Sequence, residues 1–140
     1  MRIRKLNHSV YQHQFHIVWS TKFRRKFIKE YVKEEFIEIL HGLTKKYPTL
    51  FFHAINTDKD HVHIQVEFDS DTSSSRVVQI LKWHTSIRLK KKFPFIRKMY
   101  LSGSIWSVGY FSSTVGLNEK IIKQYIQYQG RLDKPSKPKL

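Results

Sequence analysis

Short hydrophobic runs divide much of the chain into predicted β-strands. Side chains alternate between the two faces of a strand, so alternation of hydrophobic and polar residues indicates a strand with one buried face. Runs rich in Phe, Ile and Val also favour strands. The segments that fit these patterns are 11–19, 50–57, 61–68 and 104–112.

Other segments repeat their hydrophobic residues at the spacing of a helix. Helices are predicted over 28–47, 73–91 and 118–130. Ser73 and Asn118 are predicted N-caps, because their side chains can accept a hydrogen bond from the first helical turn. Gly130 is placed where a glycine commonly ends a helix. Pro48 ends the first helix, and Phe93 and Pro94 are expected to end the second.

The order of these elements predicts the fold class. Strand, helix, strand, strand, helix, strand is the split βαβ arrangement. We therefore expect an α+β protein with a ferredoxin-like (RRM-like) antiparallel sheet and two helices on one face. The last helix, which carries tyrosines, is expected over the other face. The chain predicts a single catalytic domain over 1–131, followed by a basic, disordered tail over 132–140.

Charge narrows the range of partners. The chain has 26 Lys and Arg residues against 11 Asp and Glu, a formal net charge of +15, and neither 1–29 nor 72–118 contains an acid. Long stretches without carboxylates favour a positive surface that binds nucleic acid over one that binds an anionic membrane. With no cysteine, disulfides and thiolate chemistry are excluded. No signal peptide or membrane span is predicted, so we expect a cytoplasmic protein, associated with the nucleoid when bound to DNA.

A pair of histidines lies in the third predicted strand. In the run 61–68, His61 and His63 alternate with Val62 and Ile64, so both imidazoles are expected on the face away from the hydrophobic core. Two imidazoles at this separation suit one divalent cation, which would need a third protein ligand. Taken alone, the pair also fits polar residues that face solvent, and the remaining histidines are interpreted as surface or partly buried side chains.

The last predicted helix carries a second candidate group. Tyr125 and Gln129 are four residues apart and share one helix face, while Ile122 and Ile126 form a neighbouring strip that can dock the helix. If this helix covers the face with the histidines, the amide oxygen of Gln129 is a candidate third ligand and Tyr125 a candidate nucleophile. By itself, Tyr125 fits a docking aromatic residue, with its hydroxyl at the rim, better than it fits a nucleophile.

Taken together, these residues resemble the single-tyrosine HUH transposases (histidine, hydrophobe, histidine) of small bacterial and archaeal insertion sequences. Their domesticated relatives, which act on repeated extragenic palindromes, share the pattern. The resemblance extends over almost the whole chain. It is carried by four ordered blocks: 16–25, 60–63, 106–111 with 114–116, and 125–129.

The resemblance implies an enzyme and assigns roles. It implies cleavage and rejoining of single-stranded DNA at insertion-sequence ends, assisted by Mg²⁺ or Mn²⁺, through a 5′-phosphotyrosine intermediate. His61 and His63 correspond to the metal-binding pair, Gln129 to the third ligand and Tyr125 to the nucleophile. The implied partners are single-stranded DNA with hairpin or palindromic ends and a second copy of the chain, with one strand from each subunit joining a continuous sheet.

Two further expectations concern the surroundings of this site. Tyr128 is the rival nucleophile, but the residue four positions on is Leu132, which cannot bind a metal. The candidate phosphate contacts lie in two basic segments. They are Arg24, Arg25, Lys26, Arg88, Lys90, Lys91 and Lys92, with Trp83, Phe93 and Phe95 as candidate residues for base stacking.

Two alternatives remain open from the sequence. An RRM-like sheet with excess Lys and Arg also fits a non-catalytic RNA- or single-stranded-DNA-binding module. That alternative would favour aromatic residues on the open sheet face, where His61, His63, Gln65 and Glu67 are expected instead. A domesticated relative acting on repeated palindromes would have the same chemistry. The target sequence, the hairpin bound, the preferred metal and the subunit served by each tyrosine stay undetermined.

Overall fold

The main sheet of the protein has the ferredoxin-like strand order. The structure is a computed structural model that describes residues 4–6, 9–11, 14–114 and 118–133. The strands of the main sheet are antiparallel neighbours in the order β4-β5-β3-β6, that is Phe51–Thr57, His61–Glu67, Gln14–Ser20 and Phe111–Ser113. A separate two-stranded ribbon pairs β1 (Arg4–Leu6) with β2 (Ser9–Tyr11), which the sequence analysis did not predict. The predicted fold class is confirmed.

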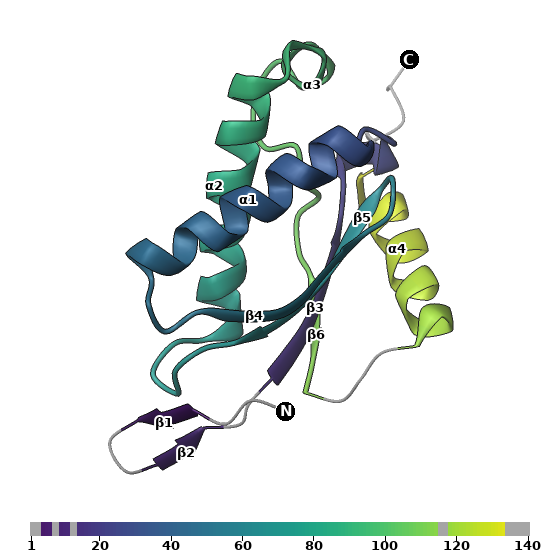
Figure 1. The fold of residues 1–140 in the computed structure, drawn as a ribbon. Coiled ribbons are helices and arrows are strands. Elements are labelled where there is room, and N and C mark those ends of the chain that lie inside the picture. The colour runs from purple at the N-terminus through teal and green to yellow at the C-terminus, as the bar shows by residue number, and fades with distance from the viewer. Residues whose placement is uncertain (1–3, 7–8, 12–13, 115–117, 134–140) are drawn as a thin grey trace.

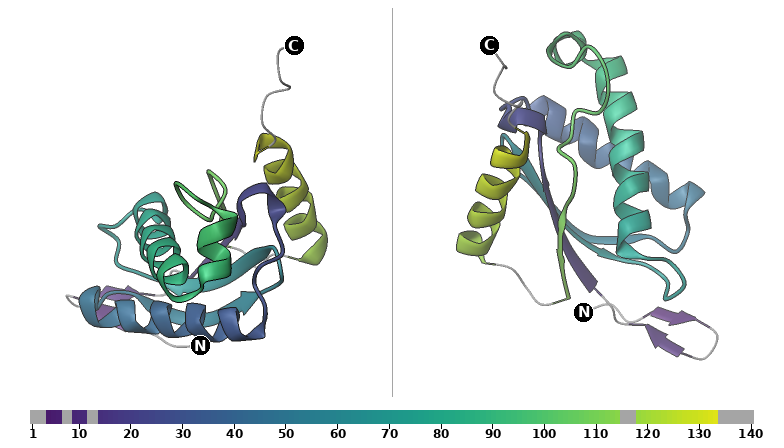
Figure 2. Two further views of the ribbon diagram at one scale, coloured as in Figure 1. Left: turned by 90° about the horizontal axis from the view of Figure 1, so that it is seen from above. Right: turned by 180° about the vertical axis from the view of Figure 1, so that it is seen from behind.

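Helices cover both faces of this sheet (Figure 1). They are α1 (Glu30–Lys46), α2 (Ser74–Lys92), the short α3 (Pro94–Met99) and α4 (Glu119–Asp133), with a 3-10 turn, η1, at Lys22–Arg24. Figure 2 shows α1 and α2 on one side of the sheet and α4 on the other. Both predicted N-caps are confirmed: Ser73 accepts from the Arg76 amide at 3.1 Å, and Asn118 from the Ile121 amide at 2.9 Å.

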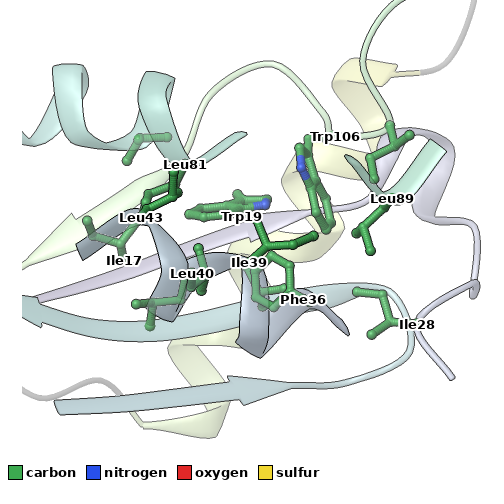
Figure 3. Packing of buried hydrophobic residues seen from close by; sticks show 14 of the residues in the cluster. Ile17, Trp19, Ile28, Phe36, Ile39, Leu40, Leu43, Leu81, Leu89 and Trp106 are labelled. Atoms are coloured by element: carbon green, nitrogen blue, oxygen red, sulfur yellow. The ribbon is translucent and has the colours of Figure 1, made fainter. Parts of the chain in front are cut away.

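The hydrophobic core lies between the sheet and α1 and α2. In β5, Val62, Ile64 and Val66 are 0% exposed, which confirms the predicted alternation. Trp19 meets Phe36 and Trp106 edge to face, with ring centroids 6.4 and 5.8 Å apart (Figure 3). The Trp106 indole N–H donates to Thr85 Oγ1 at 2.9 Å, so this buried polar group is satisfied.

The fourth strand is shorter than predicted. The segment 104–112 was expected to be a strand, but β6 spans only Phe111–Ser113, preceded by an isolated bridge between Thr21 and Trp106. Gly103 and Gly109 adopt positive φ angles of 77° and 93°, which interrupt an extended strand. Ile105 and Trp106 are instead buried in the core. The hydrophobic residues of this segment therefore reflect packing and not strand pairing.

Two helix ends also differ from the prediction. Pro94 ends α2 as expected, but it also begins α3, since proline is well suited to the first position of a helix. Gly130 does not stop the last helix, because α4 continues to Asp133. The Asp133 carboxylate accepts from the Phe23 amide at 3.0 Å and from the Ser107 hydroxyl, which fastens the last turn. Residues 132 and 133 thus belong to the helix, and the remainder of the predicted tail, 134–140, lies outside the described residues.

In the described part of the chain, no helix is long and apolar enough to cross a membrane.

Candidate active site

The histidine pair lies on the sheet face that carries α4. His61 and His63 are half-buried on β5, opposite the fully buried Val62. His63 pairs with Val18 of β3 on one side and with Asn56 of β4 on the other. The sequence prediction that both imidazoles share the face away from the main core is therefore confirmed.

Each ring of the pair has a polar partner. His61 Nδ1 lies 2.9 Å from Asp60 Oδ1, and this hydrogen bond is the main cause that holds the pKa of the Asp60 carboxyl below its usual range. Arg24 Nε lies 3.6 Å from the other oxygen of Asp60. A carboxylate on Nδ1 fixes the ring orientation and leaves Nε2 as the nitrogen available to a ligand.

His63 is paired with a histidine that the sequence analysis had assigned to no site. His63 Nε2 lies 3.3 Å from His16 Nδ1, where one ring donates and the other accepts. Burial, followed by the charges of His16 and His61, lowers the pKa of His63, and burial lowers that of His16. Both rings are therefore mostly neutral near pH 7, which is the form that binds metals.

His61 and His63 line a hollow of about 230 Å³ beneath the start of α4. Its walls come from β4, β5, the turn between them and α4: Asn56, Thr57, Asp58, His61, His63, Glu119, Ile122 and Lys123. Among the residues that the structure describes, no group of three or more His, Asp or Glu side chains is arranged to hold a metal ion. A cation on the histidine pair would therefore need an additional ligand.

Helix α4 is docked by a small hydrophobic cluster. Val18 of β3 packs against Ile122 and Ile126, which are 9% and 4% exposed. This is the apolar strip that the sequence predicted for docking. The contact fixes which sides of α4 face the two halves of the sheet, with Lys123 toward the histidine hollow.

Tyr125 and Gln129 lie against β6 and the segment before it, and they do not line the histidine hollow. The Tyr125 ring packs on Phe111 with centroids 5.7 Å apart, and Gln129 Nε2 donates to the Val108 carbonyl at 2.8 Å. A Cβ on Gly109 would come within 3.2 Å of Gln129 Nε2 and 3.9 Å of the Tyr125 oxygen. A glycine at this position therefore allows the close approach of the helix.

Two polar atoms of this pair are buried without a partner. Among the described residues, neither the Tyr125 hydroxyl nor Gln129 Oε1 has a hydrogen-bond partner. Burial, followed by the charges of Asp133 and Tyr128, raises the pKa of the Tyr125 phenol well above its usual range. Leaving buried polar groups unpaired costs about 1–3 kcal/mol each. The Tyr125 hydroxyl and Gln129 Oε1 can therefore each still bind a further group.

A half-buried lysine holds the loop against which Tyr125 and Gln129 lie. Lys82 Nζ of α2 donates to the carbonyls of Ser107 at 2.7 Å and Gly109 at 2.5 Å. Burial lowers the pKa of Lys82 to about 8, an effect that the nearby Asp133 charge opposes. Lys82 and Asp133 thus fix the loop from opposite sides, on α2 and on α4.

A second hollow of about 310 Å³ adjoins His61 and is lined by several basic side chains. Its lining includes Arg24, Lys26, Lys59 and Lys123, together with Asp58 and Asp60. Lys123 and His61 border both hollows, so the two form one path along α4. Two of the predicted phosphate contacts, Arg24 and Lys26, are thus placed beside the histidine pair.

The other predicted phosphate contacts do not line either hollow. The Arg25 guanidinium donates to the Met99 carbonyl and lies over the Tyr100 ring. Arg88, Lys90, Lys91 and Lys92 belong to the second half of α2, where Lys90 Nζ donates to Gly103 and Lys92 Nζ pairs with Glu35 at 2.6 Å. Their roles in DNA binding stay predictions.

Three polar residues of the site had no role predicted from the sequence: His16, Asp60 and Asn56. His16 was detectable, because it alternates with Phe15 and Ile17 and therefore shares the face with Val18. Asp60 belongs to the block 60–63 that carries the family resemblance, but no role was assigned to it. Asn56 becomes a neighbour of His63 through the β4–β5 register, which includes a bulge between Phe52 and Ala54. Strand periodicity alone does not predict such a shift.

The fold and the site together define a basic ferredoxin-like protein with a histidine pair and a tyrosine-bearing helix on one face of its sheet. Residues 9–129 match the family model described as "Transposase IS200 like". The chain therefore belongs to the IS200-like transposase family. This membership supports a transposase function, and thus a DNA-processing enzyme, over a non-catalytic RNA-binding module.

Individual relatives agree with this assignment. The chain is 28% identical over 131 residues to the transposase for insertion sequence element IS200 of Salmonella typhimurium, covering 94% of this chain and 86% of the relative. It is 25% identical over 121 residues to the ISDra2 transposase TnpA of Deinococcus radiodurans, covering 86% of each. The fold is similar to a crystal structure of a candidate transposase from Deinococcus radiodurans R1, with a TM-score of 0.77, 24% identity and coverage of 90% of this chain and 97% of that chain.

Proposed function

We propose that the protein cleaves and rejoins single-stranded DNA by transesterification, with Tyr125 as the nucleophile. The observation that carries the proposal is that His61 and His63 share one hollow beneath α4, the helix that also carries Tyr125 and Gln129. A phenol is a suitable nucleophile for a reversible exchange, because it is also a good leaving group. The expected substrate is single-stranded DNA with hairpin or palindromic ends, as at the ends of an insertion sequence.

The proposed reaction conserves the number of phosphodiester bonds. The Tyr125 oxygen attacks the phosphorus, an O–P bond forms, and the bond from phosphorus to the 3′-oxygen breaks. The phenol proton is lost to solvent, and the departing oxygen takes up a proton to become a free 3′-hydroxyl. The DNA is then joined to Tyr125 as a 5′-phosphotyrosine. Attack by another 3′-hydroxyl reverses these steps, releases the phenol and rejoins the strand.

The donor atoms fit a divalent cation. His61 offers Nε2 because Asp60 occupies Nδ1, His63 is mostly neutral, and the Gln129 amide oxygen is buried without a partner. Once α4 has brought Gln129 to the histidines and His63 Nε2 has parted from His16, these three residues would hold Mg²⁺ or Mn²⁺. When bound, such an ion polarises the scissile phosphate and offsets the charge that develops on its oxygens.

The docked position of α4 implies a movement before chemistry. Tyr125 and Gln129 face Gly109, while the opposite flank of α4 faces the histidines. The helix therefore has to move so that Tyr125 and Gln129 reach a histidine pair. That pair belongs either to the same chain or to a second copy of the chain. A homodimer that exchanges this helix is consistent with its small docking cluster.

The cationic hollow gives the substrate a path to the histidines. Arg24, Lys26 and Lys59 border this hollow, and Lys123 lies between it and the histidine pair. Cations along a groove bind phosphates with a strong salt dependence, because binding releases counterions. We therefore place the DNA backbone along α4, from the turn after β3 toward His63.

The test is formation of a covalent adduct. Labelled single-stranded DNA that contains a hairpin end, incubated with Mg²⁺ or Mn²⁺, should give a complex that survives denaturation. Tyr125→Phe should abolish the complex, as should His61→Ala with His63→Ala. Tyr128→Phe is the matched control, because Tyr128 lies on the same helix but is 52% exposed. An adduct that persists in Tyr125→Phe would contradict the assignment of the nucleophile.

A further inference from the structure

One large aromatic side chain outside the histidine site is left exposed on α2. Trp83 is 61% exposed, whereas Trp19 and Trp106 are 0% and 2% exposed. The other two aromatic residues that were candidates for base stacking, Phe93 and Phe95, are partly buried against the core. Exposing an indole to water is unfavourable, so covering it with a ligand would contribute to the free energy of binding.

Trp83 separates two hollows on the outer side of α2. The first, of about 330 Å³, is lined by Lys46, Arg76 and His84 among others, and the second, of about 440 Å³, by Ile87 and Gly103 among others. Both hollows include Trp83 and Gln79. The indole therefore borders two open hollows on the same side of α2.

The charge around the first hollow is positive. It is bordered by Lys46 at the end of α1 and by Arg76 in the first turn of α2. His84, which packs edge to face on Trp83 at 4.9 Å, also experiences the charges of Lys46 and Arg88. The segment 72–118 contains no acidic residue, so no carboxylate of α2 opposes these cations. This combination suits a ligand with flat bases and anionic phosphates.

We propose that Trp83 is a stacking platform for unpaired bases of single-stranded DNA, with Lys46 and Arg76 contacting the adjacent phosphates. Aromatic side chains flanked by cations bind single strands with little sequence preference, since every base has a stacking face. The site lies on the side of the sheet opposite α4, so it adds a second contact surface to the one along the histidine path (Figure 2).

Lys82 connects the Trp83 platform to the loop that contains Gly109. Lys82 precedes Trp83 in α2 and borders the apolar hollow, while its ammonium group donates to the Gly109 carbonyl. Gly109 is the residue that Gln129 and Tyr125 approach. A strand held on Trp83 would therefore lie next to Lys82, the residue that holds the loop against which α4 is docked. The inference rests on the proposed DNA substrate but not on the covalent chemistry.

Tryptophan fluorescence tests the platform without any cleavage. An oligothymidylate of roughly eight nucleotides, within the usual range for single-strand sites, is titrated in EDTA, so that strand transfer does not contribute. Because Trp19 and Trp106 are buried, stacking on Trp83 should quench the exposed component of the emission. A fully paired duplex of the same length should quench it much less. Absence of quenching by the single strand would overturn the proposal.

Variants separate stacking from charge. Trp83→Ala should weaken binding of the oligothymidylate about tenfold, and Trp83→Phe should keep most of the affinity. Lys46→Ala and Arg76→Ala should each lower the slope of log affinity against log salt by about 1. Tyr31→Ala is the control, because Tyr31 is an exposed aromatic residue (49%) on α1. An equal loss in Tyr31→Ala would show that the effect is not specific to the platform.

Two further results decide between this proposal and its rivals. If Trp83→Ala leaves the DNA affinity unchanged but shifts the sedimentation of the protein, the surface binds a second copy of the chain and the proposal is wrong. At saturating DNA, Trp83→Ala should still form the Tyr125 adduct. Loss of oligothymidylate binding with an intact adduct supports the platform, whereas an absent adduct in the unmodified protein affects only the proposed chemistry.

Discussion

Replacing Ile126 with alanine should release α4 without unfolding the rest of the protein. Ile126 is 4% exposed and packs with Ile122 on Val18, in a cluster separate from the main core. An Ile→Ala change at a buried position costs about 2–5 kcal/mol. Burial of three such side chains contributes roughly 1.5–3 kcal/mol each, before the cost of ordering the helix is subtracted. The loss is therefore comparable with the contribution of this hydrophobic cluster to the docking of α4, which the contacts of Gln129 and Asp133 supplement.

The assay follows the helix and the global fold separately. In Ile126→Ala, amide hydrogen exchange should speed up across α4, while β3 and β5 keep their protection. Burial raises the pKa of the Tyr125 phenol in the docked state, so release should return it toward about 10. The shift of a ¹³C label on the Tyr125 ring during a pH titration would report this change.

Ile39 provides the matched control, since it is also 4% exposed but lies in the main core, on α1. Ile39→Ala should lower the global free energy of unfolding by a similar amount and leave the Tyr125 pKa raised. If Ile126→Ala instead weakens the protection of α4, β3 and β5 to the same extent, the helix unfolds together with the core. The view of α4 as a separately docked element would then be wrong.

Three further changes have defined outcomes. Asp60→Asn should weaken divalent-ion binding about 10- to 100-fold, measured by calorimetry, because Asp60 orients the His61 ring. The stability that Asp60 adds relative to Asn is present above about pH 4 and should be lost as the pH falls through its lowered pKa. Lys82 has a pKa of about 8 when folded, against the usual 10.5 of a lysine in an unfolded chain, so the cost of burying its charge is full below pH 8 and is relieved toward pH 10.5. Chemical denaturation should therefore show the wild type gaining stability relative to Lys82→Met over that range, and a constant difference would contradict the burial of the charge. Ser73→Ala should cost about 1 kcal/mol of unfolding free energy, since the Ser73 hydroxyl caps α2 through the Arg76 amide.

Periodicity predicted the parts of the fold in which burial and secondary structure agree. The alternation of β5 located both histidines because its register is fixed by burial of Val62 and Ile64 on one face. The same criterion failed for 104–112, where Ile105 and Trp106 are buried without strand pairing. Hydrophobic spacing reports burial in both cases and does not by itself distinguish a strand from an irregular segment.

The candidate site was predicted in composition but not in arrangement. The spacing of Tyr125 and Gln129 placed them on one face of α4, and that is what the structure shows. Which way this face turns depends on tertiary contacts: Ile122 and Ile126 on Val18, and Gln129 on the Val108 carbonyl. These contacts join residues far apart in the chain, so a local pattern carries no information about them.

The most direct test of the central proposal is to locate the DNA on the protein. After reaction with single-stranded DNA and nuclease trimming, trypsin should release the segment 124–131, between Lys123 and Arg131, which contains both Tyr125 and Tyr128. Fragment masses should place the nucleotide phosphate on Tyr125. A phosphate on Tyr128 or on any other residue would contradict the assignment of Tyr125 as the nucleophile.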